Sequence, residues 1–268
     1  MDPMIGHALM LMAAGLLSGF LAGLLGIGGG IVTIPVLFLV FGELGTPDQW
    51  KMHAAIGTSL AIIIATNISS VRAHHKKGAV NWDLAKAWAI AIVAGSVAGS
   101  FFATTLKTVQ LVYIFASLAA FLAVKMMLPF DHWKLGSSLP SGVFKYLNPA
   151  VIGFFSAIMG IGGGSFSVPY MTLYSVPIHR AVGTASLIGL FISIAGATGY
   201  VVAGEATAAL PDGFIGFIHW PSVLVVALAA VFMAPVGARV AHKLPKTVLS
   251  IAFGMFLIAA TLRLISAV

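Results

Sequence analysis

The chain has 268 residues, of which 60% are apolar and only 8% are charged, and its mean hydropathy is +1.06. A soluble domain carries about 25% charged residues, so these values exclude an ordinary soluble protein and indicate contact with lipid. The chain contains no cysteine, which excludes disulfides, thiolate metal sites and cysteine nucleophiles. The net charge of +7 would suit a nucleic-acid-binding protein, but in a membrane protein it is better explained by topology.

Eight apolar stretches follow one another along the chain, each close to or above the roughly 20 residues that a membrane-spanning helix requires. They lie at about 8–42, 52–71, 87–106, 109–128, 147–176, 181–203, 218–241 and 247–267. The first and the fifth are too long for one crossing, because straight helices of these lengths would reach roughly 45–52 Å, against a hydrocarbon core of ~30 Å. Both contain a glycine cluster, at which we expect the helix to break.

The two glycine clusters belong to an internal repeat. Residues 26–30 read Gly-Ile-Gly-Gly-Gly and are followed by Pro35, and the same pattern recurs at 160–164 and Pro169, at a constant offset of 134. Past a shortened loop, His53 and the Gly-Thr pair at 57–58 match His179 and the pair at 183–184. The sequence therefore predicts a first repeat over 1–128, a second over 147–268 and, between them, a linker at 129–146 rich in turn-forming residues.

The loops predict the orientation of the two repeats, because Lys and Arg are retained on the cytoplasmic side of a membrane. The loop at 72–77 is basic, whereas its counterpart around Glu205 and Asp212 has no Lys or Arg. Conversely, the turn at 239–246 is basic, and its first-half equivalent has only Lys107. We therefore expect an all-α polytopic membrane protein with two inverted repeats, each a glycine-broken hairpin of two short helices followed by three transmembrane helices, with a cytoplasmic linker.

Inverted repeats with broken helices are typical of secondary transporters, whose substrate sites lie between the repeats. A helix that starts after a glycine run directs its free N–H groups and positive dipole end at the break, which favours anion binding. The second break adds the hydroxyls of Ser165 and Ser167. The alternative is that these glycines only allow close helix packing; the duplication of the whole pattern argues for a binding site.

Few other polar residues lie within the predicted helices. Asn67 is the strongest single side-chain candidate for a ligand, because an Asn in a membrane helix is costly unless it is paired. Hydroxyls such as those of Thr58, Thr184 and Ser186 more often bond their own backbone or a neighbouring helix. No Asp or Glu lies well inside a predicted helix, which argues against a carboxylate proton relay or a sodium cage of acidic ligands. We expect no metal.

His53 and His179 occupy equivalent positions, each just before the Gly-Thr pair of the following helix. Imidazole titrates near neutrality, so either could couple transport to protons; a solvated histidine near a loop end is the simpler explanation. Arg180 could attract anions to an entrance or could anchor the topology.

The paired Gly-x-Gly-Gly-Gly motifs with their prolines, and the Gly-Thr-Ala-Ser run at 183–186, resemble the sulfite exporter TauE/SafE family, also called the toluene sulfonate uptake permease family. The resemblance implies a bacterial inner-membrane carrier of sulfite, organosulfonates or related small anions, driven by the proton gradient. Carried over by position, it implies two ligand-binding stretches: Gly28, Gly29, Gly30, Thr33 and Pro35 in the first repeat, and Gly162, Gly163, Gly164, Ser165 and Pro169 in the second.

We therefore expect a multi-pass secondary transporter of the bacterial cytoplasmic membrane, and not an enzyme, that exports a small sulfur-containing anion by alternating access between the repeats. An importer or a channel for thiosulfate or another small anion is the alternative. An intramembrane enzyme or a structural subunit is a further one, but no nucleophile or metal-ligand cluster is visible. The expected partners are the anion, the lipid bilayer and protons; no cofactor and no nucleic acid are expected.

Overall fold

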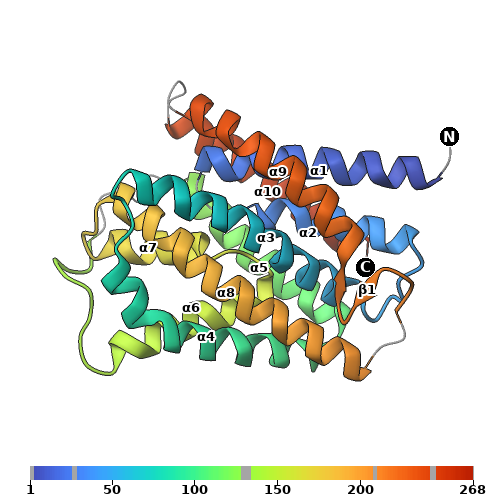
Figure 1. Cartoon of the computed structure of the whole chain (residues 1–268), viewed down its shortest axis with the longest axis horizontal. Coiled ribbons are helices and arrows are strands. Elements are labelled where there is room, and N and C mark those ends of the chain that lie inside the picture. The colour runs from blue at the N-terminus through green and yellow to red at the C-terminus, as the bar shows by residue number, and fades with distance from the viewer. Residues whose placement is uncertain (1–2, 26–28, 128–133, 208–209, 242–245, 268) are drawn as a thin grey trace.

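The structure is a computed structural model, and it describes residues 3–25, 29–127, 134–207, 210–241 and 246–267. Within these residues the chain forms ten helices and one short β-hairpin (Figure 1). In chain order they are α1 (Pro3–Leu25), α2 (Gly30–Glu43), α3 (Lys51–Lys76), α4 (Trp82–Thr104), α5 (Thr108–Met127), α6 (Phe144–Met159), α7 (Gly164–Leu173), α8 (Ile178–Thr207), β1 (Phe214–Ile215), β2 (Ile218–His219), α9 (Trp220–Ala241) and α10 (Lys246–Ile265).

The helices have the length and apolarity of membrane spans, so the prediction of an all-α polytopic membrane protein is confirmed. Five are long and apolar enough to cross a membrane by themselves: Gly6–Gly23, Lys51–Lys76, Trp82–Thr104, Ile178–Ala206 and Trp220–Gly237. The small hairpin, in which Phe214 pairs with His219 and Ile215 with Ile218, is the exception that the sequence did not predict.

Both glycine segments form helical hairpins. In the first, His7 near the start of α1 contacts Glu43 at the end of α2, with 2.8 Å between Nε2 and Oε2. In the second, the Asn148 amide on α6 donates to the Tyr170 hydroxyl on α7 over 2.7 Å. Figure 1 shows that α1 and α2 enter from one end of the bundle and α6 and α7 from the other.

The expected pair of short helices is found only in the second hairpin, where α6 has 16 residues and α7 has 10. In the first hairpin α1 has 23 residues, so the prediction of two short helices is wrong there. The reason is that the helix begins at Pro3 and includes His7, whose polar ring is accommodated by the contact with Glu43.

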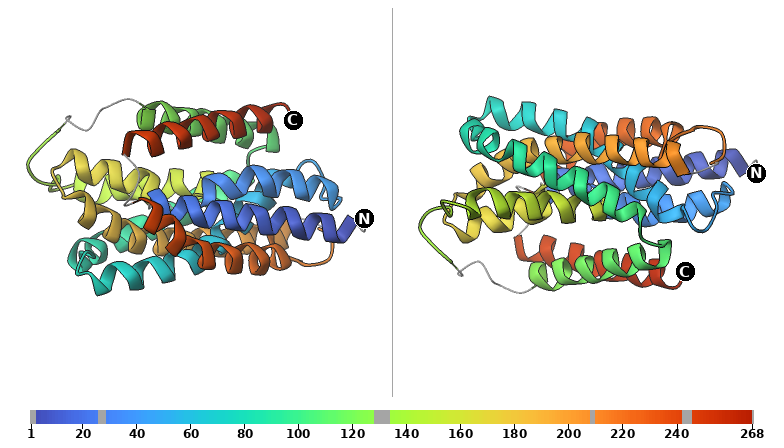
Figure 2. Two further views of the ribbon diagram at one scale, coloured as in Figure 1. Left: turned by 90° about the horizontal axis from the view of Figure 1, so that it is seen from above. Right: turned by 90° about the horizontal axis from the view of Figure 1, so that it is seen from below.

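The centre of the bundle is the pair α3 and α8. They run antiparallel, since Asn67 lies beside Gly189 and Ser70 beside Ser186. Around this pair, α1 packs on α9, α4 on α6 and α5 on α10 (Figure 2), so each contact joins one of the first five helices to one of the last five.

Glycines allow the closest of these helix contacts. A Cβ on Gly19 of α1 would lie 2.3 Å from the Ala230 oxygen of α9, and a Cβ on Gly153 of α6 would lie 2.4 Å from the Ile92 oxygen of α4. No side chain fits at such distances, and small residues at helix contacts are typical of membrane proteins. Close packing therefore explains these glycines, which lie outside the two breaks.

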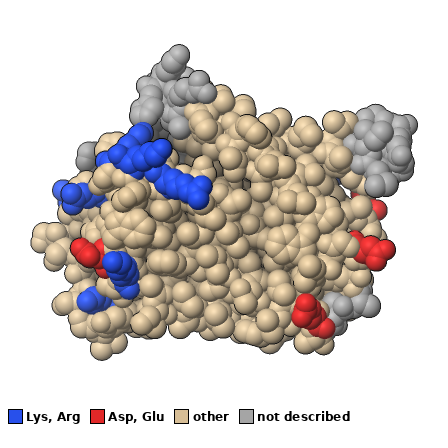
Figure 3. Space-filling view, in the orientation of Figure 1, with Lys and Arg blue, Asp and Glu red and all other residues tan. Residues whose placement is uncertain are grey.

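The charged side chains lie at the two ends of the bundle. On the face seen in Figure 3, Lys and Arg gather at the end where α3 finishes, and most of the Asp and Glu lie at the opposite end. We call these the basic end and the acidic end. The long apolar flanks between them are the surface that faces lipid.

Candidate functional site

The two glycine breaks meet inside the bundle. Gly30 opens α2 and is buried, and a Cβ on it would lie only 2.6 Å from the Gly160 oxygen at the end of α6. Gly160 itself ends α6 in the left-handed conformation, with φ of 61°, which favours glycine at a helix end. The backbones of the two hairpins thus touch where neither carries a side chain, and both following helices, α2 and α7, start close to this contact.

At the first break the hydroxyl groups are satisfied by one another and by the backbone. Ser59 on α3 donates to the Gly160 oxygen over 2.8 Å. Thr33 on α2 lies 3.1 Å from the Ser59 hydroxyl and 3.1 Å from the Gly30 oxygen. Each hydroxyl has one hydrogen and two acceptor positions, so this chain of contacts uses the hydroxyl donors of both Thr33 and Ser59.

At the second break three buried donors on α3 and α7 lack a partner, as does the Ser156 hydroxyl near the end of α6. The three donors are the Asn67 amide nitrogen on α3 and the hydroxyls of Ser165 and Ser167 on α7, and each residue is less than one-tenth exposed. An unsatisfied buried polar group costs roughly 1–3 kcal/mol, so such groups in native proteins need an explanation. Acceptor oxygens on a ligand are one kind of partner that such donors could have.

Gly189 on α8 shows where Asn67 approaches the start of α7. A Cβ on Gly189 would lie 2.7 Å from the Asn67 amide nitrogen and 3.0 Å from the backbone nitrogen of Gly163. The absence of a side chain there lets the amide of α3 approach the start of α7. Neither Gly189 nor Ser59 was predicted as a site residue; Gly189 stands outside the duplicated motifs, so no pattern in the sequence could have indicated it.

The first turn of α7 adds backbone donors. The earliest α-helical hydrogen bond into this turn runs from the Ser167 nitrogen to the Gly163 oxygen, over 2.8 Å, so the N–H groups before Ser167 have no acceptor within the helix. The positive end of the α7 dipole lies at the same end of the helix as these free N–H groups. With no buried lysine or arginine in the part of the chain that the structure describes, these neutral groups are what could hold a negative charge.

The described residues of the two glycine motifs lie at the starts of α2 and α7 or within these helices. Gly28 lies outside the described residues; Gly29 directly precedes α2, and Thr33 and Pro35 lie buried within α2. Gly162, Gly163 and Gly164 lie buried at the start of α7, with Pro169 at its sixth position.

Thr58, Thr184 and Ser186 are all engaged in contacts between helices or loops. The Thr58 hydroxyl accepts from the His219 backbone nitrogen and the Thr184 hydroxyl from that of Asn81, both over 3.0 Å. Ser186 lies 2.8 Å from the Ser70 hydroxyl, across the α3–α8 contact. These hydroxyls therefore tie elements together.

The two equivalent histidines lie in opposite environments. The His53 ring is completely buried, and its Nε2 lies 3.2 Å from the Ala103 oxygen and 3.1 Å from the Leu106 oxygen. His179 and Arg180 are exposed at the start of α8, at the basic end. His53 thus fastens α3 to the end of α4, whereas His179 and Arg180 are accessible to ions.

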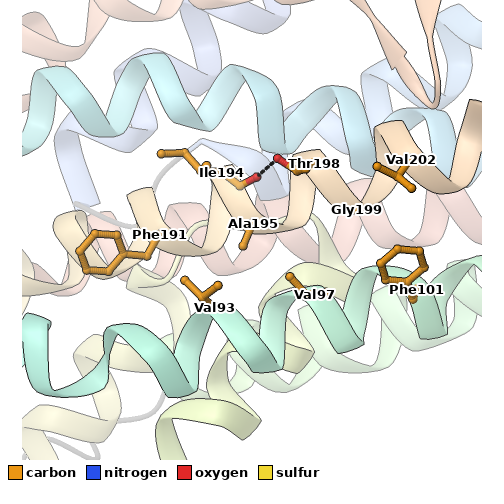
Figure 4. A pocket seen from close by; sticks show the side chains of 9 residues that line it. All are labelled: Val93, Val97, Phe101, Phe191, Ile194, Ala195, Thr198, Gly199 and Val202. Atoms are coloured by element: carbon orange, nitrogen blue, oxygen red, sulfur yellow. Dashed lines mark hydrogen bonds between the residues drawn. The ribbon is translucent and has the colours of Figure 1, made fainter.

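An apolar groove of about 280 Å³ lies between α4 and α8 (Figure 4). Its lining residues are Val93, Val97, Phe101, Phe191, Ile194, Ala195, Thr198, Gly199 and Val202. The Thr198 hydroxyl donates to the Ile194 oxygen of its own helix over 2.9 Å, and no charged side chain lines the groove. Such a lining suits contact with hydrocarbon rather than an anion. Among the described residues no group of His, Cys, Asp or Glu could hold a metal ion.

Comparison with known proteins decides the family. The model of the sulfite exporter TauE/SafE family matches residues 11–264. The chain belongs to the TauE/SafE family. A "Probable membrane transporter protein" of Haemophilus influenzae is 32% identical over 97% of this TauE/SafE chain and 99% of its own length.

Two more distant relatives carry the same kind of name. A "Probable membrane transporter protein" of Methanocaldococcus jannaschii is 26% identical, over 88% of this chain and 86% of its own. YunE of Bacillus subtilis is 25% identical, over 90% and 92%. No solved structure matches the chain. The protein is thus a TauE/SafE membrane transporter.

Proposed function

We propose that this TauE/SafE transporter carries a small sulfur-containing oxyanion, such as sulfite or an organosulfonate, out of the cell across the bacterial cytoplasmic membrane. The observation that supports it is the set of buried, unpartnered donors at the second break, Asn67, Ser165 and Ser167, beside the open first turn of α7. Oxygens on sulfur would accept hydrogen bonds from these groups. Neutral donors would bind the anion without holding it as strongly as a buried cation, so it could also leave.

We propose further that the chain consists of two inverted repeats, 1–128 and 147–268, joined by a cytoplasmic linker at 129–146. The hairpins α1–α2 and α6–α7 enter from opposite ends, and the contact of α1 with α9 has its counterpart in that of α6 with α4. The separation of basic and acidic ends supports a cytoplasmic basic end. The anion site lies between the repeats, where alternating access would expose it to each side in turn.

Proton coupling is also part of the proposal. His53, His179 and Arg180 are its candidates, the first as a buried titratable ring and the other two at the basic end, where they would attract the anion. If a pH gradient leaves the flux unchanged, proton coupling is excluded, whereas the proposed anion site is not affected.

The test is anion flux in proteoliposomes, with sulfite, sulfoacetate and thiosulfate, with and without a pH gradient. Gly189→Ala places a methyl group 2.7 Å from the Asn67 nitrogen, and we expect it to reduce flux at least tenfold. The matched control is Gly196→Ala on the same helix, whose methyl group would meet the flexible end of Leu60 at 2.9 Å; its flux should stay within twofold of the parent.

Two outcomes would contradict the proposal. Equal flux in Gly189→Ala and Gly196→Ala would exclude the second break as the site, and absence of flux for all three anions in the parent would exclude the substrate class. Flux that runs only inwards would show that the protein is an importer and not an exporter.

A further inference from the structure

At each end of the α3–α8 pair, a Gly-Thr dipeptide on one helix contacts the backbone of a loop. On α3, a Cβ on Gly57 would lie 2.7 Å from the Phe217 oxygen, and the Thr58 hydroxyl accepts from the His219 nitrogen over 3.0 Å. On α8, a Cβ on Gly183 would lie 2.6 Å from the Ala79 oxygen, and Thr184 accepts from the Asn81 nitrogen, also over 3.0 Å. Each dipeptide thus holds the backbone of the loop that precedes α9 or α4.

Both ties connect a helix from one side of the 129–146 segment to a loop from the other side. Thr58 holds the loop that leads into α9, and Thr184 holds the loop that leads into α4. Figure 1 shows the two loops at opposite ends of the bundle, the one before α4 at the basic end and the β-hairpin before α9 at the acidic end.

The candidate anion site lies between the two ties. Along α3, nine residues separate Thr58 from Asn67, which is roughly 13.5 Å at 1.5 Å per residue. Along α8, five residues separate Thr184 from Gly189, or roughly 7.5 Å. With both loops held, the donors at the second break are buried.

The two ties differ in what surrounds them. At the acidic end Phe217 lies 5.1 Å from Trp50 and 5.3 Å from His53, measured between ring centres. The His219 ring contacts Phe41 and Phe214, and its Nδ1 lies 2.7 Å from the Ser222 hydroxyl. At the basic end the Asn81 side chain caps α4 by accepting from the Leu84 nitrogen over 3.1 Å. The Trp82 ring next to Asn81 also contacts His75, so among the described residues more aromatic rings surround the tie at the acidic end.

We propose that these ties are the two gates of the transport cycle, with Thr58 and Thr184 as the positioning residues that hold each gate closed. This inference rests on the alternating access proposed above. Both gates are closed in this structure, which is thus an occluded state. In the cycle, the hydrogen bond of one threonine to its loop breaks while that of the other threonine persists, so the anion site opens to one side at a time. The gate at the basic end opens more readily, because fewer aromatic contacts have to separate there.

The test uses the natural absence of cysteine. Ser165→Cys places a single thiol at the anion site, and a membrane-impermeant thiol reagent applied to vesicles of either orientation reports the side to which the site is open. Lys77→Cys and Asp212→Cys, both at exposed positions, mark the basic and the acidic side. Thr58→Val and Thr184→Val remove the acceptor oxygen and keep the side-chain shape; Thr58→Ser and Thr184→Ser keep the acceptor and are the matched controls.

We expect Thr184→Val to raise labelling of Cys at position 165 at least threefold from the side that labels position 77, and Thr58→Val to raise it from the side that labels position 212. The serine variants should behave as the parent. Faster labelling from both sides in one variant would indicate general loosening of the fold and would contradict the proposal of two gates. Unchanged labelling in both valine variants would contradict it as well.

The gates and the proposed function can fail separately. Side-specific labelling in a protein that moves none of sulfite, sulfoacetate and thiosulfate would leave the gates standing and exclude the substrate class. Sulfite flux in the parent, together with labelling that does not depend on the side, would keep the substrate and exclude the gates.

Discussion

The two glycine breaks share a sequence motif but differ in their hydrogen bonding. At the first break, Thr33 and Ser59 satisfy each other and the backbone. At the second, the hydroxyl of Ser167, which corresponds to Thr33 at the offset of 134, has no partner. The residue that corresponds to Ser59 at the offset of 126 is Ala185, which has no hydroxyl. The replacement of a serine by an alanine at this position thus accounts for the missing partner of Ser167; we call the first break closed and the second open.

Asn67→Asp tests the open break most severely. The change keeps the size of the side chain, but it replaces the amide donor with an acceptor that carries a negative charge when ionised. Because an anion would then face a group of like charge in a buried site, we expect sulfite flux in proteoliposomes to fall by about 100-fold, which corresponds to about 2.7 kcal/mol.

Asn67→Leu serves as the control for charge and should retain more flux than the aspartate variant. Flux of the parent level in Asn67→Asp would show that α3 does not contribute to the anion site.

Removing both unpartnered hydroxyls, by Ser165→Ala with Ser167→Ala, tests whether they bind substrate or only fill space. Two hydrogen bonds of about 1 kcal/mol each predict a KM that rises by about 10- to 30-fold. The melting temperature in detergent should not fall, because no hydrogen bond within the protein is lost.

Ser59→Ala at the closed break is the matched control and should give the reverse. It leaves the Gly160 oxygen without its side-chain donor, so it should reduce the free energy of unfolding by about 1–3 kcal/mol and leave KM unchanged. Equal changes of KM in both variants would remove the distinction between the breaks.

Ala185→Ser should have the smallest effect, and it converts the open break towards the closed one. Ala185 is completely buried, and a hydroxyl there would offer Ser167 the kind of partner that Ser59 gives Thr33. We expect flux to fall about threefold and the melting temperature to rise slightly, measured in the same preparations. Higher flux in this variant would show that Ser167 is not a substrate ligand.

The duplicated motifs were enough to predict the breaks, because a glycine run between two apolar stretches has few other structural consequences in a membrane protein. The matching Gly-Thr pairs could be found in the same way, but their partners could not. Thr58 and Thr184 hold loops that lie more than 100 residues away along the chain, and such contacts leave no local pattern.

The histidines illustrate the limit of equivalence between repeats. His53 and His179 match in sequence, yet one is enclosed by the aromatic residues near the β-hairpin and the other is exposed. The hairpin exists only in the longer loop before α9, so the burial of His53 depends on an insertion in the other half. Gly189 could not be predicted either, since its importance comes only from the approach of Asn67.

The contact between Gly30 and the Gly160 oxygen also constrains how the halves can move. With a Cβ excluded at 2.6 Å, the two residues in contact carry no side chain of their own that could change rotamer to absorb a displacement. The backbones cannot approach further, so a rocking movement of the halves would have to turn about this contact. A rotation of about 10° would displace a helix end roughly 15 Å away, or about ten residues, by only about 2.6 Å, which is comparable to the length of one hydrogen bond.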